Sequence, residues 1–477
     1  MPRLFFAVFL RKPFFKVLNP TTNAKIFAAL KFTDMDFKQS IEYLYSLGHE
    51  TLAMKLGLKN TEILLAALSE PHKNFLKVQI AGTNGKGSTA AFLDSISRAA
   101  SIKTGLFTSP HLVSITERIK INGKDISEAK FAEMTAQVKK TAEKLVAENN
   151  LETLPTFFEH LTAMSLLAFA EEKVDLAILE TGLGGRLDST TAANAEIVCL
   201  TPIDLDHQEY LGETIEEIAA EKAAIIHSKT RVCIVSKQKS AAALNIILER
   251  CAEAGVKPVV DACNFKIEGA SNDGKAVATF RTDNEVYSNV RLSLRGNHQL
   301  ENAATAIVAA ENLKDFSISR AAVVQGLETA RHYGRLEFCG NVLVDGAHNP
   351  AGASALKDFL QEYFPDKRLT IVFGAMRDKD LSQIARILFS IASNLILTRA
   401  ANPRSASPKE LSELASKNAP NANIFSIDDS GEAIKKAREI SAPEDLICVT
   451  GSLYLIGEVK SVLKDKENNR DLIVERD

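Results

Sequence analysis

A glycine-rich loop between an apolar run and a helical segment constrains this chain more than any other feature of its sequence. The loop is Ala81-Gly-Thr-Asn-Gly-Lys-Gly-Ser-Thr89. It follows residues 75–80, whose apolar side chains predict a buried strand, and it leads into residues 90–98, whose spacing predicts a helix. Backbone N–H groups in such a turn, with the positive end of the helix behind them, can bind a phosphate group. The loop therefore predicts a nucleoside-triphosphate site.

The loop differs from the common phosphate-binding pattern G-x-x-x-x-G-K-[ST] at two positions. Ile80 stands where the first glycine is expected, and Gly87 stands where Ser or Thr is expected. Lys86 still supplies a positive charge for phosphate, and Ser88 or Thr89 supplies a hydroxyl near a metal ion. Because a purely structural glycine turn is the alternative, other residues must support the site.

The composition is that of an ordinary globular enzyme. The chain has 477 residues, which predicts two or three domains, and 45% of them are hydrophobic and 25% charged. The net charge of −3 gives no indication of a nucleic-acid partner. No apolar run approaches the length of a membrane span, about 18 residues. The six cysteines form no C-x-x-C pair, so we expect reduced core cysteines in a cytoplasmic protein.

Residues 1–34 differ from the rest of the sequence. The first 33 residues carry six basic side chains, no acidic one and seven of the 24 phenylalanines. We interpret this segment as an extension that results from a mis-assigned start, with Met35 as the working initiator. A transit peptide and a short amphipathic arm that packs on the protein are the alternatives.

From residue 75 onward, strand-like apolar runs alternate with helical segments, which predicts parallel sheets covered by helices. The expected fold class is α/β: a P-loop-type ATPase domain with a mainly parallel sheet, followed by a smaller Rossmann-like domain. The expected limits are 35–330 for the first domain, 331–336 for a linker and 337–477 for the second domain. The polar stretch 264–294 predicts a small antiparallel excursion.

Acidic and imidazole side chains follow two of the predicted strands. Glu180 ends one strand, and Asp204, Asp206 and His207 follow the next. Ligands of open α/β sheets bind at the carboxyl ends of the strands. Carboxylates and imidazole suit a hard or borderline divalent ion, so Mg²⁺ is expected here. The alternatives are an acid that merely ends a strand and a histidine with a structural role.

Lys222 is the most unusual residue of the sequence. Thr214 and Glu217 have the spacing of a capping box and predict a helix over residues 215–226. At about 100° per residue, Lys222 lies in the middle of the apolar face of that helix. Lysine is rarely buried without a partner, and a buried lysine with a lowered pKa reacts with electrophiles. The alternative is a side chain whose ammonium reaches past the apolar face to water.

Several motifs, taken in chain order over residues 36–460, resemble those of the folylpolyglutamate synthase/dihydrofolate synthase family, which belongs to the Mur-type ligases. The glycine-rich loop alone would be a weak indication, whereas the ordered set is specific. The motifs are GTNGKGST (82–89), FTSPHL (107–112), PTFFEHLTAM (155–164), ETGLGGRLDST (180–190), LDHQEYLG (205–212), EEIAAEKAAII (216–226), GNHQLENAATA (296–306), GR (334–335), DGAHNP (345–350), GAMRDKD (374–380) and TGSLYL (450–455).

The resemblance implies an ATP-dependent amide ligase with ATP and Mg²⁺ as cofactors. In such enzymes ATP phosphorylates a carboxylate, and an amine attacks the resulting acyl phosphate. The implied substrates are L-glutamate and a folate, with dihydropteroate as a further acceptor, and the family suggests a monomer. One alternative is a UDP-sugar peptide ligase of peptidoglycan synthesis, although the segment before residue 75 looks too short for its extra domain. The other is a nucleotide-dependent switch without catalysis.

The resemblance also implies roles for single residues. Lys86, His207 and Lys222 would be catalytic, with Lys222 as the carbamylated lysine of the family. Ser109 and Glu180 would hold one Mg²⁺, and His207 with the modified Lys222 would hold a second. The residues implied to bind ATP are Gly82, Thr83, Asn84, Gly85, Lys86, Gly87, Ser88, Thr89, Asn302, Arg335, Asp345 and His348.

Arg118 is implied to meet the pterin substrate or its glutamate tail. The sequence departs from the family pattern at two places. His332 and Tyr333 stand where Trp-Pro is frequent before Gly-Arg, and His160 stands where an aromatic residue is frequent. The first departure is expected to affect the rigidity of the linker more than the chemistry.

Overall fold

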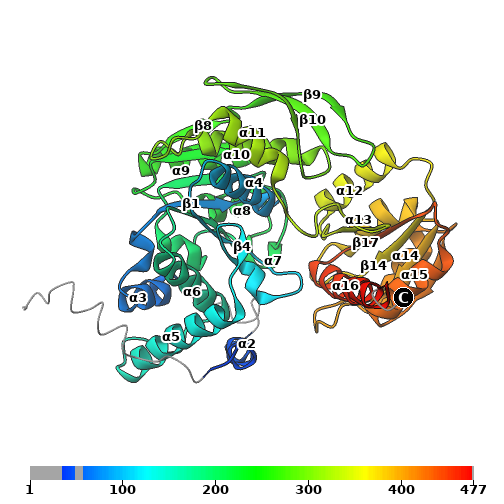
Figure 1. Cartoon of the computed structure of the whole chain (residues 1–477), viewed down its shortest axis with the longest axis horizontal. Coiled ribbons are helices and arrows are strands. Elements are labelled where there is room, and N and C mark those ends of the chain that lie inside the picture. The colour runs from blue at the N-terminus through cyan, green and yellow to red at the C-terminus, as the bar shows by residue number, and fades with distance from the viewer. Residues whose placement is uncertain (1–34, 49–56, 475–477) are drawn as a thin grey trace, which may run out of the picture.

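The computed structural model describes residues 35–48 and 57–474, with side chains described as far as residue 463 (Figure 1). The extension predicted over residues 1–34 lies outside the described residues. Helix α2 (Phe37–Ser46) begins at Asp36, whose side chain forms a capping box with Gln39. A helix therefore starts where the sequence after Met35 predicts one.

Eight strands form the larger sheet, in the order β4-β3-β2-β5-β1-β6-β7-β8. Neighbouring strands pair in parallel in the part of the sheet that runs β2-β5-β1-β6-β7-β8. Strands β3 and β4 add an antiparallel edge beside β2. The mainly parallel sheet predicted from the sequence is confirmed. The strands are β1 (Leu76–Ala81), β2 (Thr104–Phe107), β3 (Ile119–Ile121), β4 (Lys124–Asp125), β5 (Leu176–Glu180), β6 (Ile197–Leu200), β7 (Val232–Val235) and β8 (Lys257–Val260).

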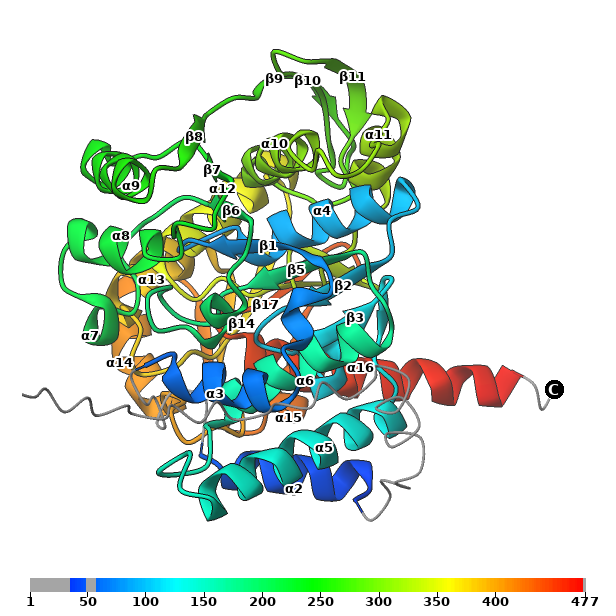
Figure 2. The ribbon, with the colours of Figure 1, turned by 90° about the vertical axis from the view of Figure 1, so that its left-hand side faces the viewer.

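Both faces of this sheet are covered, which explains why its strands are apolar throughout. In β5, Ile178 packs into the core beneath α4, α10 and α11, whereas Leu179 packs into the opposite core with α5 and α6. Figure 2 shows these two helical layers on either side of β1 and β5. The helices are α3 (Lys59–Ala67), α4 (Lys86–Ala99), α5 (Glu128–Ala147), α6 (Phe157–Glu171), α7 (Gln208–Leu211), α8 (Ile215–Ala223), α9 (Ala241–Ala254), α10 (His298–Glu311) and α11 (Arg320–Thr329).

A three-stranded antiparallel sheet confirms the excursion predicted over 264–294. Its order is β11-β10-β9, and it packs through Phe280 and Tyr287 into the core that α10 also enters. The strands are β9 (Asn264–Ala270), β10 (Ala276–Arg281) and β11 (Val286–Arg291).

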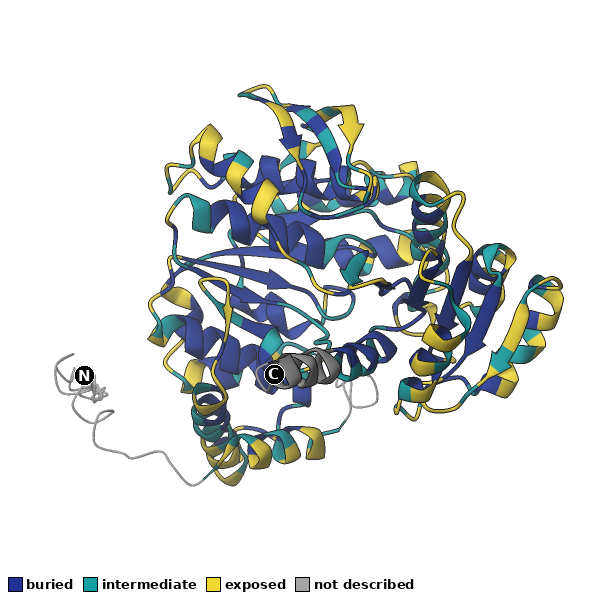
Figure 3. Cartoon of the chain, turned by 45° about the vertical axis from the view of Figure 1, so that its right-hand side comes forward, coloured by how far each residue is buried: buried dark blue, intermediate teal, exposed yellow. Residues whose placement is uncertain are grey.

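The smaller sheet has the order β12-β13-β17-β14-β15-β16, and only β12 is antiparallel. Buried strands lie between helices, as Figure 3 shows for both sheets. The strands are β12 (Glu337–Cys339), β13 (Val342–Asp345), β14 (Leu369–Phe373), β15 (Asn394–Leu397), β16 (Asn423–Ser426) and β17 (Leu446–Thr450). The helices are α12 (Pro350–Tyr363), α13 (Leu381–Leu388), α14 (Pro408–Asn418), α15 (Ser430–Ile440) and α16 (Leu453–Val474).

Residues 330–336 connect α11 to β12 and thus the larger sheet to the smaller one. The domain limits 35–330, 331–336 and 337–477 stay predictions. All six cysteines are free and five are buried, as expected for reduced core cysteines. Within residues 35–48 and 57–474, no helix is both long and apolar enough to cross a membrane. The described residues also contain four short 3₁₀ helices: η1 (Pro71–Lys73), η2 (Ile115–Arg118), η3 (Ser189–Ala193) and η4 (Phe389–Ile391).

Candidate active site

A cavity of about 590 Å³ lies where the two sheets face each other. Carboxyl ends of parallel strands from both sheets open into it, as expected for ligand sites of α/β folds. The cavity brings together most of the residues predicted to form the site. Those that line it are Thr83, Asn84, Gly85, Lys86, Gly87, Ser88, Ser109, Glu180, His207, Lys222, Asn302, Arg335, Asp345 and His348.

The glycine-rich loop lies between β1 and α4, with the helix end at the cavity. Helix α4 begins at Lys86 rather than at residue 90, because Gly85 adopts a φ of 88° and serves as its N-cap. A Cβ atom on Gly85 would collide with Oδ1 of Asn302, so glycine is required for conformation and for space. Ser88 lines the cavity, whereas Thr89 is fully buried and does not. The hydroxyl that faces the cavity is therefore that of Ser88.

Two lysine ammonium groups converge on one carbonyl of this loop. Nζ of Lys86 and Nζ of Lys222 each donate a hydrogen bond to the Gly82 carbonyl, at 3.0 Å and 3.0 Å. Lys222 is 4% exposed, so its predicted burial is confirmed. Burial, followed by repulsion from Lys86, lowers the pKa of Lys222 to about 7. The neutral amine form of Lys222 is therefore accessible near neutral pH, unlike that of an exposed lysine.

Helix α8, which carries Lys222, begins where the sequence predicts but ends before the predicted residue. The capping box of Thr214 and Glu217 is present. Helix α8 ends at Ala223 rather than at residue 226, because Ile225 and Ile226 leave it to fill the core behind β6 and β7. Lys222 thus lies in the last turn of α8, close to the phosphate-binding loop.

Glu180, the last residue of β5, reaches the cavity beside Ser109. Its Oε2 accepts a hydrogen bond from the backbone N–H of Ser109 at 3.2 Å. The side chain is 6% exposed, and burial raises its pKa although Lys86 and Arg335 act in the opposite direction. A cation at this carboxylate would offset the cost of burying its charge.

Arg335, Asp345 and His348 meet on the side of the smaller sheet. Asp345 accepts hydrogen bonds from the backbone N–H groups of Leu336 at 2.9 Å and Ala347 at 3.0 Å. Nη1 of Arg335 donates to the Gly346 carbonyl at 3.2 Å, and Nδ1 of His348 lies 2.7 Å from the same oxygen. The structure therefore places these three predicted residues around one turn after β13.

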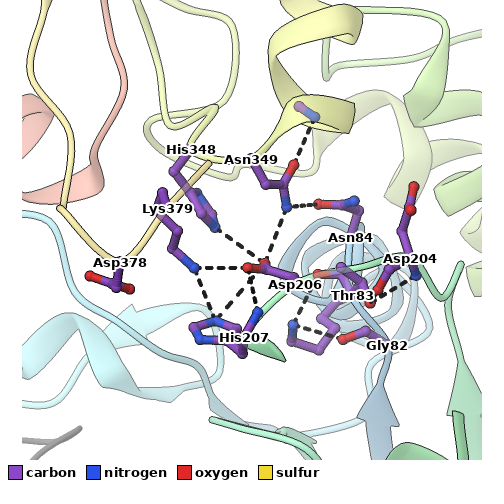
Figure 4. Close-up of polar contacts among 12 residues, drawn as sticks. Gly82, Thr83, Asn84, Asp204, Asp206, His207, His348, Asn349, Asp378 and Lys379 are labelled. Atoms are coloured by element: carbon purple, nitrogen blue, oxygen red, sulfur yellow. Dashed lines mark hydrogen bonds and ion pairs between the residues drawn. The ribbon is translucent and has the colours of Figure 1, made fainter. Parts of the chain in front are cut away.

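Asp206 forms an ion-pair network that joins the two sheets across the cavity (Figure 4). Nζ of Lys379 lies 2.8 Å from Oδ1 of Asp206, and both side chains are more than nine-tenths buried. Nδ2 of Asn349 donates to the other carboxylate oxygen at 3.2 Å. Although burial alone would raise the pKa of Asp206, His207, Lys379 and His348 hold it well below its usual range. Burial lowers the pKa of His207 to about 3, so its ring is neutral near neutral pH and adds a positive charge beside Asp206 only in strong acid.

Replacing either partner of this ion pair is expected to destabilise the protein, because the other charge is left buried and unpaired. We expect Asp206→Asn and Lys379→Met each to lower the free energy of unfolding by about 3 kcal/mol. In the double variant, the loss of unfolding free energy should be smaller than the sum of the two single losses, by about 1 kcal/mol or more. Scanning calorimetry of the four proteins checks this, and strictly additive losses would contradict a direct interaction.

Arg118, Gly82 and Thr89 are the predicted site residues that do not line the cavity. Arg118 is 2% exposed, and Nε donates to Nδ1 of His111 at 2.8 Å. Its guanidinium carbon lies 5.4 Å from the ring centroid of Phe157, which does line the cavity. Arg118 thus supports the wall of the cavity from behind.

Sequence reasoning assigned no role to Lys379, Asn349, Phe157 and Phe158, all of which lie at or near the cavity. Phe157 and Phe158 begin α6 and give one part of the cavity an aromatic wall. Two adjacent phenylalanines directly after the helix cap Thr156 are a signal that could have indicated an apolar ligand surface. Lys379 follows β14, and a charged side chain after a parallel strand is a comparable signal.

The donor groups fit a Mg²⁺ ion that shares its coordination with phosphate. Among the residues that the structure describes, no three His, Cys, Asp or Glu side chains are arranged to hold a metal. Mg²⁺ usually binds one or two carboxylates together with substrate phosphates and water. The carboxylate of Glu180 agrees with that pattern, and Ser109, which contacts it, adds a hydroxyl oxygen. The imidazole of His207 is a less usual ligand of Mg²⁺.

Two family profiles match the parts of the chain that form the cavity. The profile of the Mur ligase middle domain matches residues 80–310, and that of the Mur ligase glutamate ligase domain matches residues 334–453. With a phosphate-binding loop facing a second α/β unit across a cavity, these matches define an ATP-dependent ligase of the Mur type.

Relatives narrow this class to one family. A dihydrofolate synthase/folylpolyglutamate synthase of Bacillus subtilis is 37% identical over 430 residues, which are 87% of this chain and 97% of that relative. The chain therefore belongs to the folylpolyglutamate synthase/dihydrofolate synthase family, as its motifs predicted.

Solved structures of similar proteins have the same fold. Folylpolyglutamate synthase of Mycobacterium tuberculosis, complexed with ADP and AMPPCP, has a TM-score of 0.82 and 30% identity, covering 90% of this chain and 99% of that one. A bifunctional folylpolyglutamate synthase/dihydrofolate synthase of Yersinia pestis, complexed with AMPPNP and a Mn ion, has a TM-score of 0.78 and 26% identity, covering 91% of this chain and 100% of that one. Both proteins bind a nucleotide or a nucleotide analogue, and the Yersinia pestis protein also binds a Mn ion.

Proposed function

We propose that this chain joins L-glutamate to tetrahydrofolate, and also to dihydropteroate, through an acyl-phosphate intermediate. The observation that carries the proposal is one cavity in which the phosphate-binding loop, Glu180 and Lys222 face an aromatic wall at Phe157 and Phe158. The loop suits a triphosphate, and the aromatic wall suits a flat pterin ring. A ligase of this kind needs both surfaces within reach of each other.

In this proposal the N–H groups at the start of α4 and the ammonium of Lys86 bind the ATP phosphates. Asn302, Arg335, Asp345 and His348 bind the rest of the nucleotide, and Arg118 acts on the pterin side from behind Phe157. Ser109 and Glu180 would hold one Mg²⁺, and His207 with a carbamylated Lys222 would hold the other. When bound, Mg²⁺ would offset negative charge on the phosphates.

The proposed reaction has two displacement steps. A carboxylate oxygen of the pterin substrate bonds to the terminal phosphorus of ATP as the bond to ADP breaks. The glutamate nitrogen then bonds to the carboxyl carbon, phosphate leaves, and the amine loses a proton. Lys86 and Arg335 offset the charge that builds up between phosphate and carboxylate, and the cavity limits competing attack by water.

A phosphate-release assay tests this function. Purified protein with ATP, Mg²⁺ and L-glutamate is expected to release phosphate only when dihydropteroate or tetrahydrofolate is added, and to form one amide bond per phosphate. Activity with UDP-muramoyl substrates and with neither pterin would instead indicate a peptidoglycan ligase. Nucleotide-dependent binding of a partner without an amide product would indicate a switch, a role that needs no buried lysine beside the phosphate loop.

We further propose that the enzyme works as a monomer in the cytoplasm. The two sheets of one chain already line the whole cavity described above, so a second copy is not needed to complete it. Size-exclusion chromatography with light scattering checks the oligomeric state, and a dimer at enzyme-assay concentrations would contradict it.

A further inference from the structure

His332 lies between α11 and β12 and contacts the phosphate-binding loop from the connecting segment. Its Nδ1 lies 3.0 Å from Oγ of Ser88, although 244 residues separate the two in sequence. A Cβ atom on Gly87 would lie 2.7 Å from Cε1 of His332 and 3.4 Å from Oε1 of Glu180. The imidazole thus fills the space above Gly87, between the loop and the carboxylate that ends β5.

The direction of this hydrogen bond decides what Ser88 can do. If Ser88 donates its hydroxyl proton to Nδ1, both lone pairs of Oγ stay available for another partner. If Nδ1 donates instead, it occupies one of those lone pairs. Burial, followed by repulsion from Arg335, lowers the pKa of His332 to about 3, so the ring is neutral and one of its nitrogens accepts.

We propose that His332 is a positioning residue, which accepts the hydroxyl proton of Ser88 and thereby aims Oγ toward the cation that accompanies a nucleotide in the cavity. The inference rests on the proposed nucleotide site. It also assigns a function to one departure of this chain from its family, since His332 stands where tryptophan is frequent. Because His332 belongs to the segment that joins the two sheets, the orientation of Ser88 depends on where that segment lies.

Two variants of His332 separate this role from simple space filling. In His332→Asn the side-chain oxygen can accept the same proton, whereas His332→Leu retains bulk but has no acceptor. Tyr333→Phe is the matched control, because Tyr333 is 47% exposed and packs against Lys460 outside the cavity. Calorimetric titration of the full chain with ADP, with Mg²⁺ and with a chelator, measures the effect of each change on binding.

We expect His332→Leu to weaken binding of Mg·ADP about tenfold and binding of metal-free ADP by less than about twofold, since one hydrogen bond to the loop hydroxyl is lost. His332→Asn and Tyr333→Phe should bind Mg·ADP within about threefold of the unchanged protein. Equal losses with and without Mg²⁺, or equal losses in the Asn and Leu variants, would overturn the proposal. This comparison of ADP binding with and without Mg²⁺ tests the role of His332 even if the protein binds Mg·ADP without ligating glutamate.

Nitrogen NMR of the unchanged protein gives a second test, which does not depend on whether any variant folds. With imidazole nitrogens labelled, we expect His332 to carry its proton on Nε2, leaving Nδ1 as the acceptor. A proton on Nδ1 would overturn the proposal, because Ser88 would then be the acceptor of the hydrogen bond.

Discussion

Replacing Lys222 by Ala is expected to lower glutamate ligation about a thousandfold, measured as phosphate release with saturating ATP, Mg²⁺ and pterin. The pKa of about 7 leaves a neutral amine that can attack CO₂. In that step the amine nitrogen bonds to the carbon of CO₂ as one C=O π bond opens, the nitrogen loses a proton, and the resulting carbamate anion would be able to hold Mg²⁺. Below this pKa the amine is protonated and does not react, so the fraction of carbamate should fall as the pH is lowered.

Short carboxylates should partially restore activity to Lys222→Ala, because formate or acetate can occupy the space of the proposed carbamate. Carbon NMR with labelled CO₂ should show a carbamate signal that is missing in the variant. Lys77→Met is the matched control. Lys77 is equally buried but pairs with Glu196 at 3.0 Å, outside the cavity, so this change should lower stability and leave turnover intact. Full activity of Lys222→Ala would remove its proposed role.

Replacing Glu180 by Gln is expected to lower kcat/KM by about a hundredfold or more while raising the melting temperature of the ligand-free protein. Gln can still accept the hydrogen bond from Ser109, so the change mainly removes charge. Because the folded pKa of Glu180 is raised, ionisation destabilises the folded state. This cost is absent below the pKa of the unfolded chain and grows as pH rises through the folded pKa.

The gain in melting temperature of Glu180→Gln should therefore be present at neutral pH and disappear in acid, which scanning calorimetry at both pH values measures. A higher Mg²⁺ requirement should accompany the loss of kcat/KM. Glu196→Gln serves as the control, because it removes the partner of Lys77 and should lower stability without affecting kcat/KM. Unchanged Mg²⁺ dependence in Glu180→Gln would contradict a metal role.

Local patterns explain which parts of the fold the sequence could predict. Apolar runs marked most strands of both sheets, because strands buried on both faces have no polar alternation. The capping box at Thr214 set the start of α8 and hence the angular position of Lys222 on its buried face. The ends of helices were predicted less well. The left-handed conformation of Gly85 lets α4 begin four residues before its predicted start. Helix α8 ends before its predicted last residue, because Ile225 and Ile226 turn into the core.

By itself, then, the sequence determined the order of strands and helices, the phosphate-binding loop and the burial of Lys222, because all of these follow from spacing within a few turns of chain. Only the tertiary structure decided that Asp206 pairs with Lys379, that Arg118 lies behind Phe157 rather than in the cavity, and that His332 meets Ser88. Such contacts join residues far apart in sequence. They depend on how two sheets face each other, and no local periodicity encodes that arrangement.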